Sequence, residues 1–171
     1  MLKRLSKKTA AFQAVAMVLV LCTASSAFAN TWQNVNSIAG GFAVEMPGAP
    51  ERTVKTVDLS GKPTPMHNFL FATGNESYYV TYSDFPFSVT AAQLLTDVRN
   101  GQVGTGRVFS ETSISVNGRP GKHFVFAKDD QLFVSRIVID NLRVYQVIYA
   151  TNSSQISPAG SAFVNSFRVT R

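Results

Sequence analysis

The sequence predicts an α+β fold in which an antiparallel β-sheet ends in a four-stranded meander and is flanked by two helices, as an α/β/α sandwich. Four runs rich in Val, Ile, Phe and Tyr lie between Val108 and Ala150. They are separated by Asn117-Gly118, Asp129-Asp130 and Asp140-Asn141, pairs that tolerate the positive φ of two-residue hairpin loops. Two other stretches begin with helix-capping residues and carry apolar side chains at helical spacing.

Two-residue loops also set which side chains share a face of the meander, because neighbouring residues of a strand point to opposite sides. We expect Phe126 to face Phe133 and Ile137 to face Val144. One face should be apolar and covered by a helix or a second layer, with the members Phe124, Phe126, Phe133, Ile137, Val144 and Ile148. The other face collects Val125, Val134 and Val147. Apolar residues on both faces of one strand indicate that both faces are covered, which predicts a layered fold.

The earlier part of the chain predicts further strands. Residues 30–41 are polar with one Trp and form a leading segment that pairs at an edge or stays loose. Residues 42–46 alternate as a half-buried strand, and residues 52–59 are polar enough for an edge strand. Residues 60–65 contain two prolines and predict a turn. An aromatic hairpin follows, and its register predicts the pairs Ala72 with Ser77, Phe71 with Tyr78, Phe69 with Val80 and His67 with Tyr82.

Two helices are predicted from their first residues. Thr90 and Gln93 fit a capping box, apolar residues follow at helical spacing, and Asn100-Gly101 is expected to end the helix. Ser157-Pro158 opens the second helix, although Gly160 weakens it by about 1 kcal/mol relative to Ala. Arg168 to Thr170 form a short extended piece that can lie beside the sheet.

The N-terminal residues predict export. A basic start, a short apolar run and the Ala27-Phe28-Ala29 site form a secretory signal peptide, so we expect cleavage after Ala29 and a single domain over residues 30–171. The location would then be periplasmic or secreted. A lipoprotein alternative at Cys22 is less well matched, because Leu21 precedes that cysteine. No cysteine follows Cys22, so a hydrophobic core without disulfides must hold the exported domain together.

Charge and composition exclude several partners. Removal of Lys3, Arg4, Lys7 and Lys8 lowers the formal net charge from +6 to +2, and no basic cluster remains for nucleic acid or an anionic membrane surface. The mature chain has no further span for the membrane. Two distant histidines and no mature cysteine argue against a zinc site, and no cofactor is expected. The remaining partner class is another envelope protein.

No motif in the chain identifies a reaction. Gly101, Gly104 and Gly106 give a G-x-x-G-x-G pattern that follows a helix, whereas a dinucleotide loop precedes one. Walker, G-x-S-x-G and H-E-x-x-H sequences are absent, and Asp129-Asp130 and Asp140 are used in hairpin turns. His67 is expected to be a packed or surface histidine. The sequence therefore predicts a protein that is not an enzyme.

The candidate binding residues are His123, Arg136 and Tyr145, which the expected register places in one row across the sheet. Arg136 interrupts an apolar strand, and a guanidinium there needs acceptors or water. In a structural role, it reaches the sheet edge or hydrogen-bonds helix-end carbonyls and the Tyr145 hydroxyl. In a binding role, the row forms the floor of a site for an anion or for a partner's carboxylate.

The order of these elements resembles the PsbP-like superfamily. The resemblance rests on a signal peptide, FAVEMPGAP, the aromatic strand YYVTY, a helix, a hairpin led by NGRPG, and LFVSRIVIDNLRVYQVIYA before a helix ending in NSF. That superfamily includes extrinsic subunits of photosystem II and uncharacterised exported bacterial proteins. The resemblance implies an α/β/α sandwich and a non-enzymatic accessory or interaction role.

Three function hypotheses follow, from different classes. The first is an exported accessory domain that contacts another protein or envelope component. The second is a carrier that holds a small anionic or amphipathic ligand between sheet and helix. The third is a hydrolase whose site the sequence does not reveal.

Overall fold

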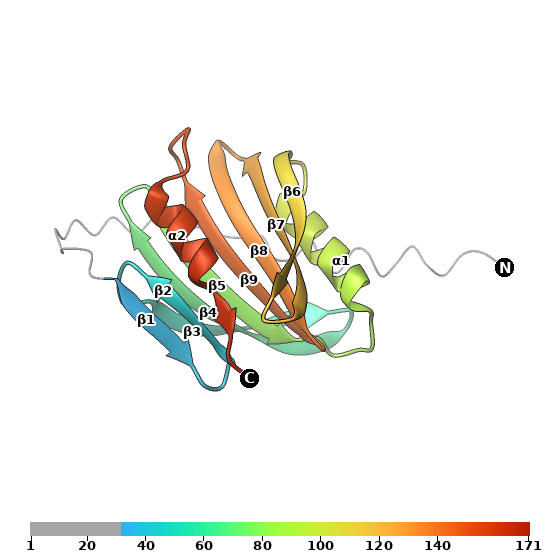
Figure 1. Cartoon of the computed structure of the whole chain (residues 1–171). Helices are drawn as coiled ribbons and strands as arrows, with labels where there is room; N and C mark the ends of the chain where they lie inside the picture. The colour runs from blue at the N-terminus through green and yellow to red at the C-terminus, as the bar shows by residue number, and fades with distance from the viewer. Residues whose placement is uncertain (1–31) are drawn as a thin grey trace.

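A seven-stranded antiparallel sheet forms the centre of the molecule. The computed structural model describes residues 32–171, and Figure 1 shows the strands in the order β3-β4-β5-β9-β8-β7-β6. The strands are β3 (Glu51–Leu59), β4 (Lys62–Thr73), β5 (Glu76–Asp84), β6 (Arg107–Val116), β7 (Arg119–Lys128), β8 (Gln131–Asp140) and β9 (Arg143–Thr151). The last four form the predicted meander, and the pairing of β5 with β9 joins it to the earlier strands.

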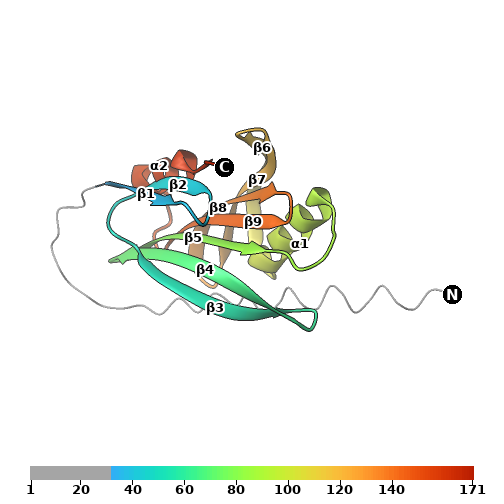
Figure 2. The same cartoon turned by 90° about the horizontal axis from the view of Figure 1, so that it is seen from below.

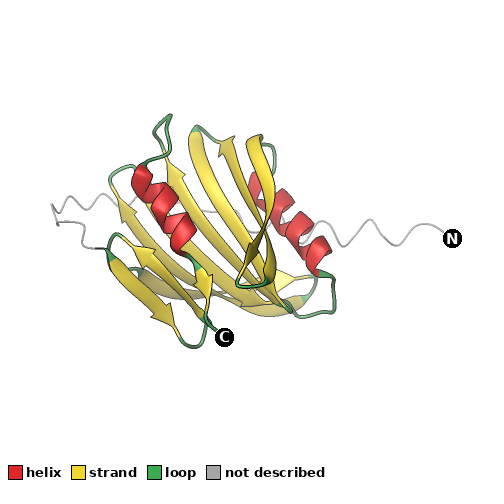
Figure 3. Ribbon diagram, viewed as in Figure 1, coloured by secondary structure: helices red, strands yellow, loops and turns green. Residues whose placement is uncertain are grey.

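Different layers cover the two faces of this sheet. Helix α1 (Ala91–Val103) packs on one face, whereas α2 (Pro158–Ser166) packs on the other. Beside α2 lies a three-stranded sheet in the order β1-β2-β10, made of β1 (Gln33–Ser37), β2 (Phe42–Met46) and β10 (Arg168–Val169). Figure 2 shows this small sheet and α2 on the same side of the large sheet, and Figure 3 distinguishes helices from strands by colour. The predicted α+β sandwich is confirmed, with an additional small sheet in the α2 layer.

The first two turns of the meander are confirmed. Asn117, Gly118, Asp129 and Asp130 all have positive φ, between 49° and 79°. Val116 accordingly pairs with Arg119, and Lys128 pairs with Gln131. Because the second turn has the expected length, Phe126 faces Phe133, and their rings stack with centroids 4.7 Å apart.

The third turn lies one residue later than predicted. Asp140 pairs with Arg143, so the turn consists of Asn141 and Leu142, and Asn141 has φ 57°. The predicted pair of Ile137 with Val144 is therefore wrong: Ile137 faces Gln146, and Val144 faces Ile139. Asp140 stays in the strand, where its carboxylate binds two arginines. Since this displacement moves each partner by two residues, every side chain keeps its predicted face.

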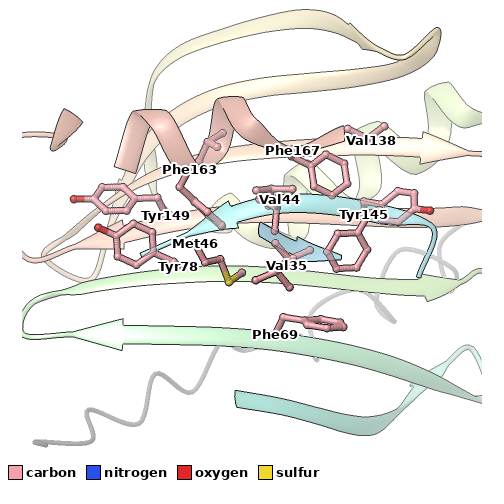
Figure 4. Close-up of a cluster of buried hydrophobic side chains, with 14 of the residues drawn as sticks. Val35, Val44, Met46, Phe69, Tyr78, Val138, Tyr145, Tyr149, Phe163 and Phe167 are labelled. Atoms are coloured by element: carbon pink, nitrogen blue, oxygen red, sulfur yellow. The ribbon is translucent and has the colours of Figure 1, made fainter. Parts of the chain in front are cut away.

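Because a shift of two residues leaves each side chain on the same side of the sheet, the predicted apolar face is correct. All six of its members are buried in one cluster under α1, together with the α1 residues Leu94, Leu95, Val98 and Val103. On the opposite face, a second cluster fills the space between the large sheet, the small sheet and α2. Figure 4 shows its side chains, among them Val44, Met46, Tyr78, Tyr145, Tyr149, Phe163 and Phe167. These packed side chains occupy the region where a carrier would hold its ligand.

The register of the aromatic hairpin is also confirmed. Phe71 pairs with Tyr78 and Phe69 with Val80, while the rings of His67 and Tyr82 stack at 4.5 Å. The predicted proline turn is wrong, because the actual turn is Ser60-Gly61 and both prolines lie inside β4. They are tolerated because β5 pairs with β4 only from His67 onward, so this part of β4 needs no N–H on that side.

Both helices begin where predicted. Thr90 and Ser157 are the N-caps, and their hydroxyls accept hydrogen bonds from the backbone N–H groups of Gln93 and Gly160. The Gln93 side chain does not complete the capping box, since it donates to Asp97 at 2.8 Å. Helix α1 also continues through the expected stop at residues 100–101 and ends at Val103. Gly104, with φ 54°, terminates it by donating its N–H to the Asn100 carbonyl.

The small sheet was not predicted as a separate unit. The leading segment forms β1, which pairs with β2, and the extended piece at the C-terminal end forms β10 on the other side of β2. The signal-peptide prediction concerns residues 1–29, which lie outside the described residues. Within residues 32–171, no helix has the length and apolar character needed to cross a membrane.

Candidate functional site

Two of the three candidate residues are neighbours in the sheet. His123 on β7 pairs directly with Arg136 on β8, as the register predicted. Tyr145 on β9 pairs with Val138, whereas the partner of Arg136 on β9 is Val147. The predicted row is therefore wrong at its third position, because the β8–β9 turn lies one residue later than Asp140-Asn141. All three side chains remain on the α2 face of the sheet.

Tyr145 has a partner in the small-sheet layer. Its hydroxyl donates to the Gly40 carbonyl in the β1–β2 turn at 2.7 Å, and its residue is completely buried. The ring contacts Phe42 and Phe167 in the same core. Burial raises the pKa of the Tyr145 phenol, so the hydroxyl stays a donor at neutral pH. This residue holds the β1–β2 turn on the large sheet.

Arg136 instead reaches α2. Its Nη2 donates to Oδ1 of Asn165 at 2.5 Å. The Nε atom is buried and has no hydrogen-bond partner among residues 32–171. Burial lowers the pKa of the guanidinium below its ordinary value, which still leaves it charged at neutral pH. In a structural role, Arg136 was expected to bind helix-end carbonyls and the Tyr145 hydroxyl. Its one hydrogen-bond partner in the described chain is instead the side-chain amide of Asn165.

The lack of a carboxylate distinguishes Arg136 from the other partly buried arginines of the described chain. Arg143 binds Asp84 through two nitrogens, each 2.6 Å from an oxygen. Arg99 binds Glu111 at 2.8 Å. Arg119 Nε lies 3.2 Å from Asp140, as an ion pair without hydrogen-bond geometry. Within residues 32–171, Arg136 forms no ion pair, so its charge is uncompensated in a half-buried position.

His123 adds a second polar group without a partner. Its Nδ1 atom is buried and forms no hydrogen bond within the described chain. Burial, and then the charge of Arg136, lower the pKa of this imidazole below its usual 6.5. His123 is therefore neutral at neutral pH, and it can offer one N–H donor without adding a second positive charge beside Arg136.

The surroundings of this pair are polar and accessible. Thr112 pairs with His123 from the edge strand β6, and Thr112 and Asn165 are both exposed. Asn165 uses its oxygen to accept from Arg136, and its amide nitrogen has no hydrogen-bond partner among residues 32–171, so it can donate to a ligand. We call Thr112, His123, Arg136 and Asn165 the arginine site. The Thr112 hydroxyl donates to the Ser113 carbonyl at 3.4 Å. The groups left without a partner in the described chain are therefore mainly N–H donors, which suit an anionic ligand.

Sequence reasoning missed Asn165. The helix that carries it was predicted, but the crossing of α2 over β8 depends on tertiary packing. Nothing in the local pattern links a polar residue near the end of this helix to an arginine on a strand. The unusual position of Arg136 within an apolar run was the signal that located the site.

A second polar network holds the end of the sheet together. Asp140 binds Arg171 at 2.7 Å as well as Arg119. Arg143 donates to the carbonyls of Ala39 and Gly40, in addition to its bonds with Asp84. The Arg143 contacts connect β5 and β9 with the β1–β2 turn, and the Asp140 ion pairs connect β8 with β7 and with Arg171. Three arginines share two aspartates in this network, and each charge has a partner of opposite sign, so these contacts serve the fold.

The described residues provide no metal centre. Among residues 32–171, no three or more His, Cys, Asp or Glu side chains are grouped so that they could hold a metal ion. The arginine site itself contains no carboxylate. Its arrangement fits recognition of an acceptor group and lacks a nucleophile paired with a base.

Comparison with known proteins identifies the fold. No protein-family model matches the sequence, and no curated protein does. Among solved structures, the chain is similar to the solution structure of cyanobacterial PsbP (CyanoP) from Synechocystis sp. PCC 6803, with a TM-score of 0.59 and 13% identity. The match covers 87% of this chain and 98% of that one. The chain thus has a PsbP-like fold, as the resemblance implied.

A second structure is similar over a smaller share of the chain. It is PA94 from Pseudomonas aeruginosa, a protein of unknown function, with a TM-score of 0.40 and 9% identity. The match covers 72% of this chain and 84% of that one.

Proposed function

We propose that this protein is an exported, non-enzymatic accessory domain that acts by contacting another envelope protein. In this proposal, residues 1–29 are removed as a signal peptide, and residues 30–171 work as a single PsbP-like domain in the periplasm or outside the cell. The PsbP-like fold supports an accessory or interaction role. The signal-peptide pattern of residues 1–29 supports export.

One observation carries the choice of contact surface: the half-buried charge of Arg136 lacks an ion-pair partner among residues 32–171. A half-buried charge without a counterion loses hydration, so a partner's acceptor at the accessible Nη groups of Arg136 would gain a charge-assisted hydrogen bond on binding. The adjacent residues are exposed on β6 and α2, where a second protein can approach. We place the contact surface on the arginine site and assign the α1 face a structural role.

Site-specific photo-crosslinking tests this proposal. A photoreactive amino acid at Thr112, which is exposed beside His123, should give one dominant crosslinked product in intact cells. The matched control is the same amino acid at Val54, which is 61% exposed on the opposite edge strand β3. Equal products from both positions would contradict a defined surface. Absence of any product from Thr112 would contradict the interaction role.

Export is tested separately by the mass of the mature protein. We expect the protein recovered from the periplasm or medium to begin at Asn30. Recovery of the full chain from Met1, or of a lipid-modified form starting at Cys22, would contradict the proposed processing.

A further inference from the structure

The arginine site has a shape that restricts its ligand. Nε of Arg136 is buried, so the edge of the guanidinium that a ligand can approach is the one formed by the two Nη atoms. One Nη2 hydrogen is already bound to Asn165. The remaining Nη donors lie in the guanidinium plane and match two oxygens held side by side.

The charge of the site restricts its ligand further. Arg136 supplies one positive charge, while His123 is neutral beside it. Further along the same face, Arg119 on β7 and Asp140 on β8 already form an ion pair with each other. On the opposite face, Lys122 binds Glu111 at 2.6 Å. A single uncompensated charge fits a monoanion better than a phosphate dianion.

The positions of the flanking donors complete the site. Asn165 accepts from Arg136 and thereby orients the guanidinium, while its own amide nitrogen stays free. His123 lies directly across from Arg136 on the neighbouring strand. A ligand between them would receive hydrogen bonds from two strands and from α2 at once.

We propose that the arginine site binds a carboxylate, with both oxygens on the Nη edge of Arg136 and additional hydrogen bonds from Asn165 and His123. The carboxylate belongs to the contacting protein, as an Asp or Glu side chain or a chain terminus. This inference rests on the proposed function for its biological partner. Its chemistry, however, can be tested on the purified protein alone.

The experiment is an NMR titration of purified residues 30–171 with sodium acetate, at constant ionic strength and with chloride as the balancing anion. We expect saturable shifts of the Asn165 side-chain amide and the His123 ring, with millimolar affinity, about what one isolated carboxylate contact gives. A parallel titration with inorganic phosphate should show weaker binding. No saturation with acetate, or tighter binding of phosphate, would overturn the assignment.

Variants show whether Arg136 carries the binding. Arg136→Met should weaken acetate binding at least about tenfold, the loss expected for a charge-assisted bidentate contact. The control Arg52→Met removes an exposed arginine from β3 and should leave binding unchanged. Should Arg136→Met fail to fold, Asn165→Ala at an exposed helix position provides the second test and should weaken binding severalfold. Undiminished binding in a folded Arg136→Met protein would contradict the proposal.

Two carboxylate sources can be separated with capped amino acids. N-acetyl-glutamate α-amide presents a side-chain carboxylate, and N-acetyl-glycine presents a chain terminus. The tighter ligand identifies the source. Carboxylate binding in vitro without any crosslink from Thr112 in cells would disprove the proposed function and leave this site assignment intact.

Discussion

Gly160 on α2 lies directly against the ring of Tyr149 on β9. A Cβ atom at residue 160 would stand 2.5 Å from Cζ of Tyr149 and 2.6 Å from two further ring atoms. The Tyr149 hydroxyl is also tied in place, because it donates to Glu76 at 2.6 Å. Gly160 lowers the intrinsic stability of α2. Because it has no side chain, however, it allows the helix to pack closely against the sheet.

Gly160→Ala should destabilise the protein by up to about 2 kcal/mol. Helix propensity favours alanine by about 1 kcal/mol, but overpacking a buried contact costs about 1–3 kcal/mol, and the fixed ring cannot easily move aside. Urea denaturation would measure the change. Ser161→Ala, one residue along the same helix, is the control and should be neutral or slightly stabilising. Higher stability of Gly160→Ala would show that Tyr149 moves without cost.

Arg136→Met should change the free energy of unfolding by less than about 1 kcal/mol. It loses one hydrogen bond to Asn165 but also removes a buried donor that has no partner in the described chain, and these effects offset each other. Arg143→Met is the contrast, because it leaves Asp84 and the Ala39 carbonyl without their donor, removes one of the two donors to the Gly40 carbonyl, and should cost about 2 kcal/mol or more. A loss of several kcal/mol for Arg136→Met would assign this residue to the fold.

Asp84 should give a stability contribution that disappears in acid. Its hydrogen bonds with Arg143 hold the pKa of this carboxyl below the ordinary 3.8. Because the folded-state pKa is depressed, the contribution is present above about pH 4 and is lost as pH falls through the folded pKa. Since the side chain is 63% exposed, solvent screening limits the effect to less than about 1 kcal/mol. Asp84→Asn should therefore be less stable than the parent protein at pH 7. The denaturation curves of the two should converge as the pH falls through the folded-state pKa of Asp84.

Tyr145→Phe should cost about 0.5–1.5 kcal/mol, because it removes the hydrogen bond to Gly40 without creating a cavity. The Gly40 carbonyl keeps its bond from Arg143 at 3.1 Å, which limits the loss. Thermal unfolding would measure the change, and acetate titration should be unaffected. Weakened acetate binding in this variant would mean that Tyr145 belongs to the arginine site after all.

Local chemistry predicted much of the fold because the decisive signals were short in range. Asn117-Gly118 adopts the positive φ that the pair favours, and Thr90 and Ser157 cap their helices. The third turn was misplaced because Asp140 and Asn141 both suit a turn, and distant arginines decide which of them joins the strand. The Asn100-Gly101 stop failed because the packing of α1 through Val103 outweighs the cost of two weak helix formers.

The candidate site was predictable only within the sheet. Strand periodicity was sufficient to place His123 opposite Arg136, since the turn between their strands has a strong local signal. The separation of Tyr145 follows from the later position of the β8–β9 turn. The approach of Asn165 to Arg136 depends on the contacts by which α2 docks on the sheet. Those contacts join segments far apart in the chain, and no local propensity encodes them.

The pairing of β2 with β10 has a consequence for the order of assembly. Phe42 pairs with Val169, and the Thr170 N–H reaches the Gly41 carbonyl, so the small sheet joins segments from the two ends of the described chain. Closing so long a loop is entropically costly and slow compared with forming the adjacent hairpins of the meander. The part of the core under α2 therefore completes late. The small sheet cannot be complete until Val169 has been synthesised, because β10 supplies one of its three strands.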